Sequence, residues 1–211
     1  MTVRVIIADD HPVVRQGLKQ MLSTEADLAV AGEASSSQET VELCGRVAWE
    51  VAVVDYNMPG KGGVELVKEL RRRFPQRPVL VLSMYPEDQY ALRVLKAGAA
   101  GYLTKESAAE DLVNAIRKVA KGGRFVSTAL GELLAQELAG GEDQPLHRKL
   151  SDREYQIMWL IASGKTISEI ALQLFLSPNT ISTYRARILE KLELKNNAEL
   201  MHYAIRHQLA E

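Results

Sequence analysis

The alternation of short apolar segments with longer stretches of helical spacing constrains the fold of this chain more than any other feature. Between residues 3 and 120 the pattern repeats five times. The apolar segments carry Val, Ile and Leu at successive positions, which is typical of strands buried on both faces. They lie at residues 3–8, 28–32, 51–55, 78–83 and 101–105. Such strands separated by helices predict an α/β fold with a five-stranded, doubly wound parallel sheet.

The third of these segments ends in an acidic residue, Asp55, and Pro59 and Gly60 then turn the chain. Ligands of parallel α/β sheets bind at the carboxyl ends of strands. Asp55 stands at such an end. It is therefore the first residue that we expect to carry chemistry.

Further polar residues follow the other strands at what should be the same edge of the sheet. Asp9 and Asp10 follow the first strand, Ser83 ends the fourth and Lys105 ends the fifth. Neighbouring ionised carboxylates repel one another unless a cation lies among them, and a hard divalent ion such as Mg²⁺ prefers oxygen ligands. Lys105 and Ser83 would flank an incoming anion. The pattern predicts phosphoryl transfer to a carboxylate, with Mg²⁺ as the cofactor.

Each of these residues also has a simpler interpretation when taken alone. Asp9 or Asp10 could have the purely structural role of capping the following helix. Ser83 could simply be the last residue of a strand, and Lys105 could be a solvated surface residue. We expect no histidine or second base close enough to promote rapid hydrolysis, so an acyl phosphate would persist. The conjunction of these residue types at several strand ends favours the chemical interpretation.

The character of the chain becomes all-helical from Leu150 onward. Capping boxes begin at Ser151 and Thr166, and Ser177 followed by Pro178 is typical of a third helix start. Only a few residues separate the second and third of these helices, which indicates a helix-turn-helix within an all-α, four-helix domain. The sequence predicts domains at 1–121 and 147–211. Residues 122–146 form a linker with one helix, and the stretch 140–145 has a typical linker composition.

Polar and basic residues gather on the third of these helices, where they could reach bases or phosphates in a major groove of double-stranded DNA. The region from Leu146 onward has nine Lys/Arg and seven Asp/Glu, a mildly basic balance, and a solvated helix face is the alternative. The candidate DNA-binding residues are Ser177, Asn179, Thr180, Ser182, Thr183, Arg185, Arg187 and Lys191.

Composition excludes several classes of protein. With 46% apolar and 25% charged residues, the 211-residue chain is not expected to be disordered. We find neither a run of about 18 apolar residues nor a signal peptide at the N-terminus, so we expect a cytoplasmic protein without a membrane partner. The single cysteine, Cys44, cannot form a disulfide within one chain, and we expect it to be a core residue.

Both halves carry motifs of a known family. One set resembles the flavodoxin-like receiver domain of two-component response regulators: Asp9-Asp10, Asp55 with Met58-Pro59, Ser83, Tyr102 and Lys105. The other resembles the LuxR-type helix-turn-helix: Leu150-Ser151 with Arg153-Glu154, Ile170-Ala171 with Leu174, and Ser177 with Thr180-Ile181. The combination resembles the NarL/FixJ family of bacterial transcription regulators.

The resemblance implies roles for individual residues. Asp55 would accept a phosphoryl group from a sensor histidine kinase. The Asp10 and Asp55 side chains and the Asn57 carbonyl oxygen would hold Mg²⁺, with Asp9 acting on the same ion. Lys105 and Ser83 would bind the phosphoryl oxygens, and Tyr102 would be a switch that follows Ser83 inward.

The same resemblance implies a DNA-binding homodimer in the phosphorylated state, and not an enzyme. Phosphorylation would bias a pre-existing equilibrium toward a form that dimerises or frees the DNA-binding helix. Two other classes stay open at this point. One is a metal-dependent phosphatase or phosphotransferase, and the other is an interaction module whose helical domain binds a protein instead of DNA.

Overall fold

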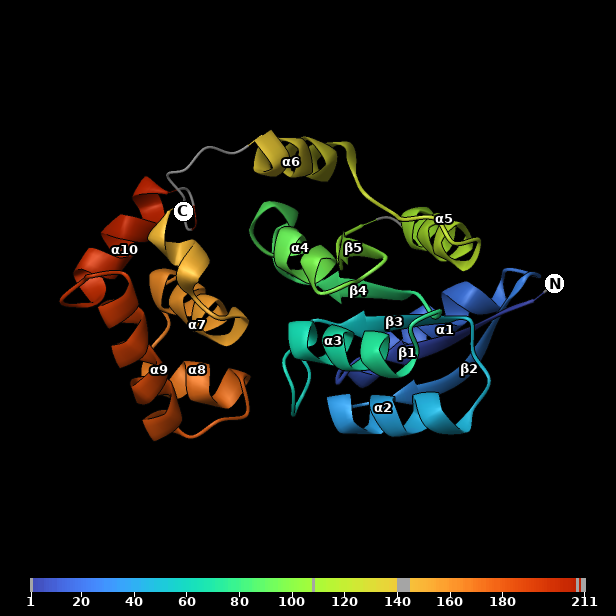
Figure 1. Ribbon diagram of the computed structural model, residues 1–211. Coiled ribbons are helices and arrows are strands. Elements are labelled where there is room, and N and C mark those ends of the chain that lie inside the picture. Colours follow the sequence, from blue (N-terminus) through green and yellow to red (C-terminus); the bar gives the residue numbers. More distant parts are fainter. Residues whose placement is uncertain (1, 108, 140–144, 208, 210–211) are drawn as a thin grey trace. The chain divides into compact units, whose positions relative to one another are not determined.

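The computed structural model describes residues 2–107, 109–139, 145–207 and 209. Contacts divide the chain into two compact units, Met1–Leu138 and Ala139–Glu211 (Figure 1). Each unit has its own core, and each is described here by itself. The expected linker stretch 140–145 lies outside the described residues, apart from Pro145.

The first unit is built on a five-stranded parallel sheet, as the sequence predicts. Its strand order is β2-β1-β3-β4-β5. The order reverses direction beside β1 and β3, which is where ligands of such sheets bind. The strands are β1 (Val3–Ala8), β2 (Leu28–Ala34), β3 (Val51–Asp55), β4 (Val79–Ser83) and β5 (Gly101–Thr104).

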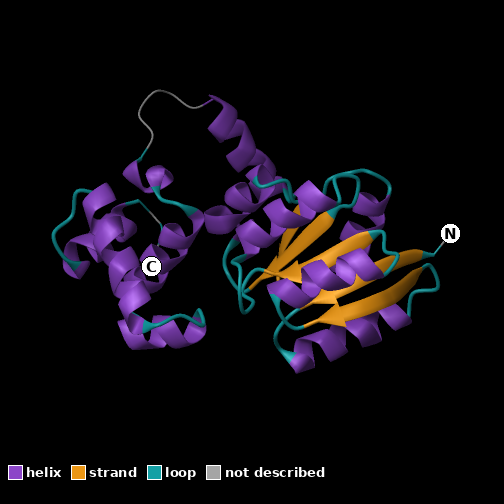
Figure 2. Ribbon diagram, turned by 60° about the horizontal axis from the view of Figure 1, so that its bottom comes forward, coloured by secondary structure: helices purple, strands orange, loops and turns teal. Residues whose placement is uncertain are grey.

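Helices cover both faces of this sheet (Figure 2). One face packs on α1 and α5, with Leu22 and Ile116 almost fully buried against strand residues such as Val53. The other face packs on α2, α3 and α4 (Figure 1). The helices are α1 (Pro12–Ser23), α2 (Ser37–Arg46), α3 (Gly63–Arg73), α4 (Glu87–Lys96) and α5 (Ala109–Ala120).

The chain after α5 returns to the edge of the sheet before it leaves the first unit. Phe125 forms a parallel bridge with Gly101, and its N–H donates to Ala100 O at 2.8 Å. Ser127 Oγ then donates to Glu87 Oε2 at 2.6 Å and accepts from Leu130 N at 3.0 Å, which caps α6 (Thr128–Ala139). The segment that follows α5 is therefore fastened to both β5 and α4.

The second unit is all-helical, as predicted. Ser151 and Thr166 each form a complete capping box, and Ser177 caps α9 with Pro178 at its first turn. On α10, Leu200 and Ala204 are buried, whereas Ile205 is 58% exposed because the helix turns that position away from them. The elements are η1 (Leu146–Lys149), α7 (Asp152–Ala162), α8 (Ile167–Gln173), α9 (Pro178–Lys191) and α10 (Asn197–Arg206).

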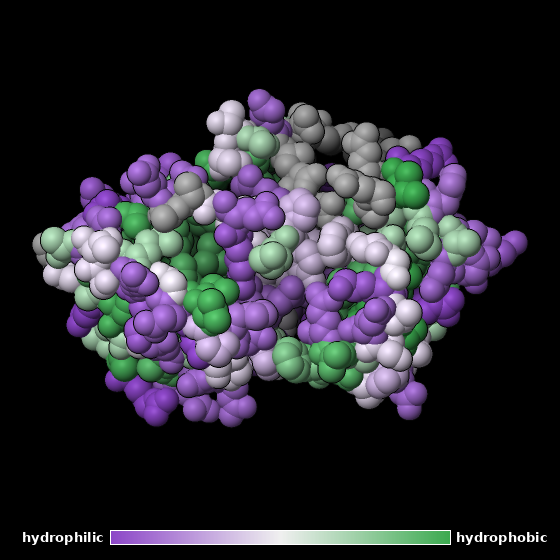
Figure 3. All heavy atoms as spheres, turned by 180° about the vertical axis from the view of Figure 1, so that it is seen from behind, coloured by the Kyte–Doolittle hydropathy of each residue, from purple (hydrophilic) through white to green (hydrophobic). Residues whose placement is uncertain are grey.

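The surface drawn in Figure 3 mixes polar and apolar side chains. The described residues include no helix that is both long enough and apolar enough to cross a bilayer. Among the large apolar residues that the structure describes, Val13 and Leu172 have the highest fractional exposure, 84% and 80%, and they belong to different units.

Candidate functional site

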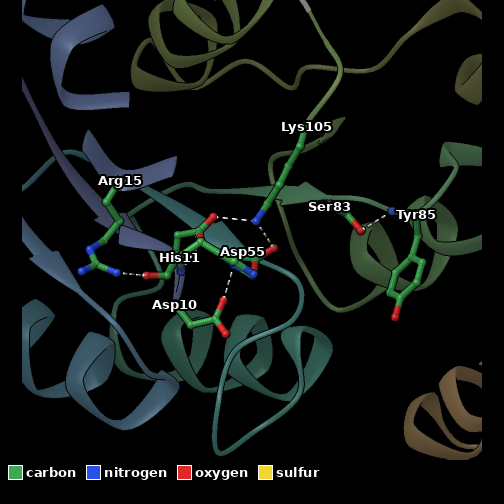
Figure 4. A network of polar contacts seen from close by, with 8 residues as sticks. Asp10, His11, Arg15, Asp55, Ser83, Tyr85 and Lys105 are labelled. Carbon is green, nitrogen blue, oxygen red and sulfur yellow. Dashed lines mark hydrogen bonds and ion pairs between the residues drawn. The ribbon is translucent and has the colours of Figure 1, made fainter. Parts of the chain in front are cut away.

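The carboxyl ends of β1, β3 and β5 bring three charged residues into direct contact (Figure 4). The Lys105 ammonium lies 2.6 Å from Asp9 Oδ2 and 3.1 Å from Asp55 Oδ1. Parallel register produces this meeting, because Ala8 pairs with Val54 and Lys105 N donates to Ser83 O at 2.7 Å. The predicted grouping of Asp9, Asp55 and Lys105 at one rim is what the structure shows.

Burial makes this small cluster electrostatically unusual. The side chains of Asp9 and Asp55 are 1% and 3% exposed, and that of Lys105 is 10% exposed. Burial, together with the nearby Asp9 charge, raises the pKa of Asp55 to about 7, although the pull of Lys105 opposes this. Burial disfavours the charge on Lys105, but Asp55 and Asp9 outweigh it and raise the pKa of the lysine.

One carboxylate oxygen at the rim, Asp55 Oδ2, is buried without a hydrogen-bond partner, and Asp10 Oδ1 is buried with the His11 ring beside it. A buried oxygen without a partner is costly unless something binds it. One ligand atom from each of Asp9, Asp10, His11 and Asp55 lies within 4.8 Å of every other. A cluster of carboxylate oxygens with unmet bonding capacity fits a divalent cation.

His11 belongs to this cluster, and the sequence-based expectation of no histidine near the site is wrong. Its Nδ1 lies 2.8 Å from Asp10 Oδ1 and 3.2 Å from Asp9 Oδ1, while its backbone N–H donates to Asp9 Oδ1 at 2.8 Å. The adjacency of His11 to two acids was the signal that could have revealed it. Arg15, which donates to the Asp9 carbonyl oxygen at 2.6 Å, was also missed.

The loop after β3 carries Asn57, which is half-buried and whose backbone N–H donates to Asp55. Ser37, at the start of α2, fastens this loop. Its N–H and hydroxyl both donate to Pro59 O at 3.1 Å, and its Oγ accepts from Lys61 N at 2.7 Å. Ser37 therefore positions the loop that brings Asn57 to the site, a role that no sequence pattern indicates.

Ser83 and Tyr102 are linked through a third residue, Tyr85. Tyr85 N donates to Ser83 Oγ at 3.0 Å, and the Tyr102 hydroxyl donates to Tyr85 O at 2.8 Å. Tyr102 is 1% exposed, so its ring already lies inward, and burial raises the pKa of its hydroxyl. Tyr85 stacks on Tyr90 of α4, with ring centroids 4.6 Å apart. Hydrogen bonds and ring stacking through Tyr85 therefore connect the end of β4 to α4.

The helix-turn-helix consists of α8 and α9. Five of the candidate DNA-binding residues lie at exposed positions of α9: Asn179, Ser182, Thr183, Arg187 and Lys191. Ser182 and Thr183 donate to carbonyl oxygens one turn back, at 2.9 and 3.0 Å, which leaves their oxygens as acceptors. Ser177 and Thr180 form the helix cap, with Thr180 N donating to Ser177 Oγ at 3.1 Å.

Two of the basic candidates are held by other side chains of the second unit. Arg185 Nε donates to Asn197 Oδ1 at 2.5 Å, and Lys191 Nζ donates to Glu154 Oε2 at 2.6 Å. Both contacts join α9 to another helix of its own domain. Arg187 is exposed, so it is the basic residue of α9 best placed for a phosphate.

A parallel sheet with buried acids and a lysine at its rim, joined to a helix-turn-helix domain, defines a DNA-binding response regulator. Comparison with known families agrees. The response regulator receiver domain matches residues 5–117, and the luxR family of bacterial regulatory proteins matches residues 148–204.

Whole-length relatives extend this result. Response regulator UvrY of Escherichia coli is 36% identical over 208 residues, covering 98% of this chain and 95% of the relative. Response regulator GacA of Pseudomonas aeruginosa is 37% identical over 214 residues, covering 99% and 98%. Salmonella RcsB bound to a promoter in the presence of the phosphomimetic BeF3⁻ is 30% identical, with a TM-score of 0.66 and coverage of 96% and 98%. The chain therefore belongs to the NarL/FixJ family of transcriptional response regulators.

Proposed function

We propose that Asp55 accepts a phosphoryl group from a sensor histidine kinase and that its phosphorylation controls DNA binding by the second unit. One observation carries this proposal: the Asp55 carboxylate stands at a strand end with one oxygen 3.1 Å from Lys105 Nζ and the other buried without a hydrogen-bond partner. The family membership of the chain supports the proposal.

The transfer requires the ionised form of Asp55. Its oxygen attacks phosphorus, the P–N bond of the phosphohistidine breaks, and the departing imidazole nitrogen takes up a proton. Lys105 and the Ser83 hydroxyl bind the transferred oxygens. Asp9, Asp10, Asp55 and the Asn57 carbonyl oxygen would hold Mg²⁺, which would neutralise phosphoryl charge when bound. The product is a phosphorylated regulator, and we expect no turnover of a separate substrate.

Phosphorylation changes the surface of the domain through contacts that involve Ser83, Tyr85 and Tyr102. When Ser83 Oγ turns to a phosphoryl oxygen, it gives up the N–H of Tyr85 that it now accepts. Tyr85 in turn holds the Tyr102 hydroxyl and stacks on α4. The rearrangement biases an existing equilibrium toward a state that dimerises or frees α9.

Double-stranded DNA is the partner of the second unit. The residues that we assign to it are Ser177, Asn179, Thr180, Ser182, Thr183, Arg185, Arg187 and Lys191. The solved RcsB structures include a DNA complex and two dimers bound to two parallel DNAs, which supports DNA binding by a homodimer here. We assign residues 1–121 to the receiver domain, 122–146 to the linker and 147–211 to the DNA-binding domain.

Binding of genomic DNA fragments, measured with and without acetyl phosphate and Mg²⁺, tests the proposal. Phosphorylation should tighten binding of the wild type and leave Asp55→Asn unchanged. Equal affinity of both proteins under all conditions would contradict phosphorylation control. Loss of all DNA binding in a folded Asp55→Asn protein would contradict the separate role of the second unit.

A further inference from the structure

We propose that His11 supplies a nitrogen ligand to the cation at the Asp55 site and shifts its metal preference toward transition-metal ions such as Mn²⁺ and Co²⁺. The inference rests on the proposed function of Asp55, because it names a further residue of the same site. It concerns which ion the rim selects.

The position of His11 is fixed by its backbone. The residue precedes α1 in an extended conformation, with φ −88° and ψ 112°, and Pro12 begins the helix. Its backbone N–H donates to Asp9 Oδ1 at 2.8 Å. The ring consequently stands over the two acids, with Nδ1 at 2.8 Å from Asp10 Oδ1 (Figure 4).

Lys105 divides the carboxylate oxygens of the site into two sets. It takes Asp9 Oδ2 and Asp55 Oδ1, at 2.6 and 3.1 Å. Asp9 Oδ1, Asp10 Oδ1 and Asp55 Oδ2 form the second set. Asp9 Oδ1 accepts from the His11 backbone N–H, and Asp10 Oδ1 lies 2.8 Å from His11 Nδ1, so both already contact His11. Asp55 Oδ2 is the decisive atom among them, because its residue is 3% exposed and the atom has no hydrogen-bond partner.

The imidazole completes this second set. One donor atom from each of the three acids and His11 lies within 4.8 Å of every other. Ligands about 2.1 Å from one ion can be at most about 4.2 Å apart. A contraction of a few tenths of an ångström would therefore bring all four donors to a single ion, and the His11 side chain, 64% exposed, has room to move.

The kinds of donor atom at the site determine which ions bind more tightly. Mg²⁺ takes oxygen ligands and keeps several waters, whereas imidazole nitrogen suits first-row transition metals. With Mg²⁺ in place, the exposed ring can turn away and leave its position to water. With Mn²⁺ or Co²⁺ the ring can stay, so His11 adds affinity for these ions and little for Mg²⁺.

Pulsed electron paramagnetic resonance of bound Mn²⁺ tests ligation directly. The wild-type full-length protein should show hyperfine coupling to an imidazole ¹⁴N, and His11→Gln should lose it. The ratio of Mn²⁺ to Mg²⁺ affinity, from titration and competition, should fall by about tenfold in His11→Gln. The matched control is His202→Gln, an exposed histidine on α10 in the other unit, which should keep both properties.

Absence of nitrogen coupling in the wild type would overturn the proposal, and so would an unchanged affinity ratio in folded His11→Gln. The wild-type measurement does not depend on any variant folding. The function of Asp55 is assessed separately, by the mass of wild type and Asp55→Asn after acetyl phosphate and Mg²⁺ treatment. A phosphorylated wild type without nitrogen coupling would reject the role of His11 alone, whereas an unmodified wild type would reject the proposed function.

Discussion

The Lys105 ammonium lies 3.1 Å from Asp55 Oδ1, and this ion pair is almost completely removed from water. Removing one partner of a buried pair leaves an uncompensated charge, which costs far more than loss of an exposed pair. Here a second acid, Asp9, shares the same ammonium at 2.6 Å. The stability of the receiver should therefore depend strongly on the charge state of the rim.

Replacing Lys105 by Met should destabilise the first unit by about 2–4 kcal/mol at pH 8 without divalent cations, because two buried acids lose their shared counter-charge. The loss should be smaller near pH 4, where Asp55 is protonated. Urea unfolding followed by circular dichroism measures it. Lys61→Met is the matched control: Lys61 is 58% exposed and its partner Glu69 keeps Arg73 at 2.7 Å, so its loss should cost at most about 1 kcal/mol. Equal effects of the two changes would refute this account.

Asp55→Asn should become progressively more stabilising as pH rises. Burial raises the pKa of Asp55 to about 7, whereas an unfolded aspartate titrates near 4. Between these values the unfolded chain has lost its proton and the native chain has not, so wild-type stability falls as pH rises through the interval. The amide variant lacks this loss. Its advantage, measured without metal, should grow by about 2–4 kcal/mol from pH 4 to pH 8.

Two controls apply to that titration. Asp111→Asn, at an exposed position of α5, should show no comparable pH-dependent gain. Millimolar Mg²⁺ should reduce the advantage of Asp55→Asn at pH 8, because a bound cation stabilises the ionised wild type. A pH-independent difference between wild type and Asp55→Asn would show that Asp55 is not buried with a raised pKa.

The hydroxyl of Tyr102 and the hydroxyl of Ser83 should be energetically coupled. Tyr102→Phe removes the 2.8 Å bond to Tyr85 O, and Ser83→Ala removes the acceptor of Tyr85 N at 3.0 Å. Each change should cost about 1–2 kcal/mol because a buried backbone group loses its partner. A double-mutant cycle in urea should give a coupling of about 0.5–1.5 kcal/mol. Strict additivity would mean that Tyr85 does not connect the two residues.

Much of the first unit could be predicted because its strands are continuous apolar runs and its strand ends are polar. Parallel pairing then forces Asp9, Asp55 and Lys105 to one edge, whatever the details of packing. The helix caps of the second unit could also be predicted, since a capping box such as that at Ser151 involves residues only three apart. These features need no knowledge of which helix packs where.

The remaining features depend on tertiary approach. The hydroxyl of Ser37 meets Pro59 and Lys61 only after α2 packs beside the loop following β3. Tyr85 joins Ser83 to Tyr102 through its backbone, which any residue type supplies. Sequence patterns carry little information about such contacts. His11 is a different case, because it adjoins two acids in the sequence, and that adjacency alone could have placed it at the site.

Arg187 and Lys191 should contribute differently to DNA binding although both are basic residues of α9. Both side chains are exposed, but Lys191 is held by Glu154 at 2.6 Å. Each phosphate contact adds about one unit to the dependence of log affinity on log salt concentration. Arg187→Ala should therefore lower this slope by about one, and Lys191→Ala should change it less. Fluorescence anisotropy with labelled DNA from about 50 to 200 mM salt measures both slopes.

The contact between Lys191 and Glu154 also predicts a difference in stability between the two variants, and here Lys191→Ala should have the larger effect. Glu154 is buried. Burial acts to raise its pKa, but the hydrogen bonds from Lys191 and Ser151 outweigh burial and hold the pKa below its usual range. Lys191→Ala should therefore destabilise the second unit by about 1 kcal/mol, and Arg187→Ala should leave its unfolding unchanged. Arg72→Ala, at an exposed position of α3 in the first unit, is the charge-matched control and should leave the salt slope unchanged. A larger salt effect for Lys191 than for Arg187 would show that DNA displaces Glu154, which would make this ion pair part of the binding equilibrium.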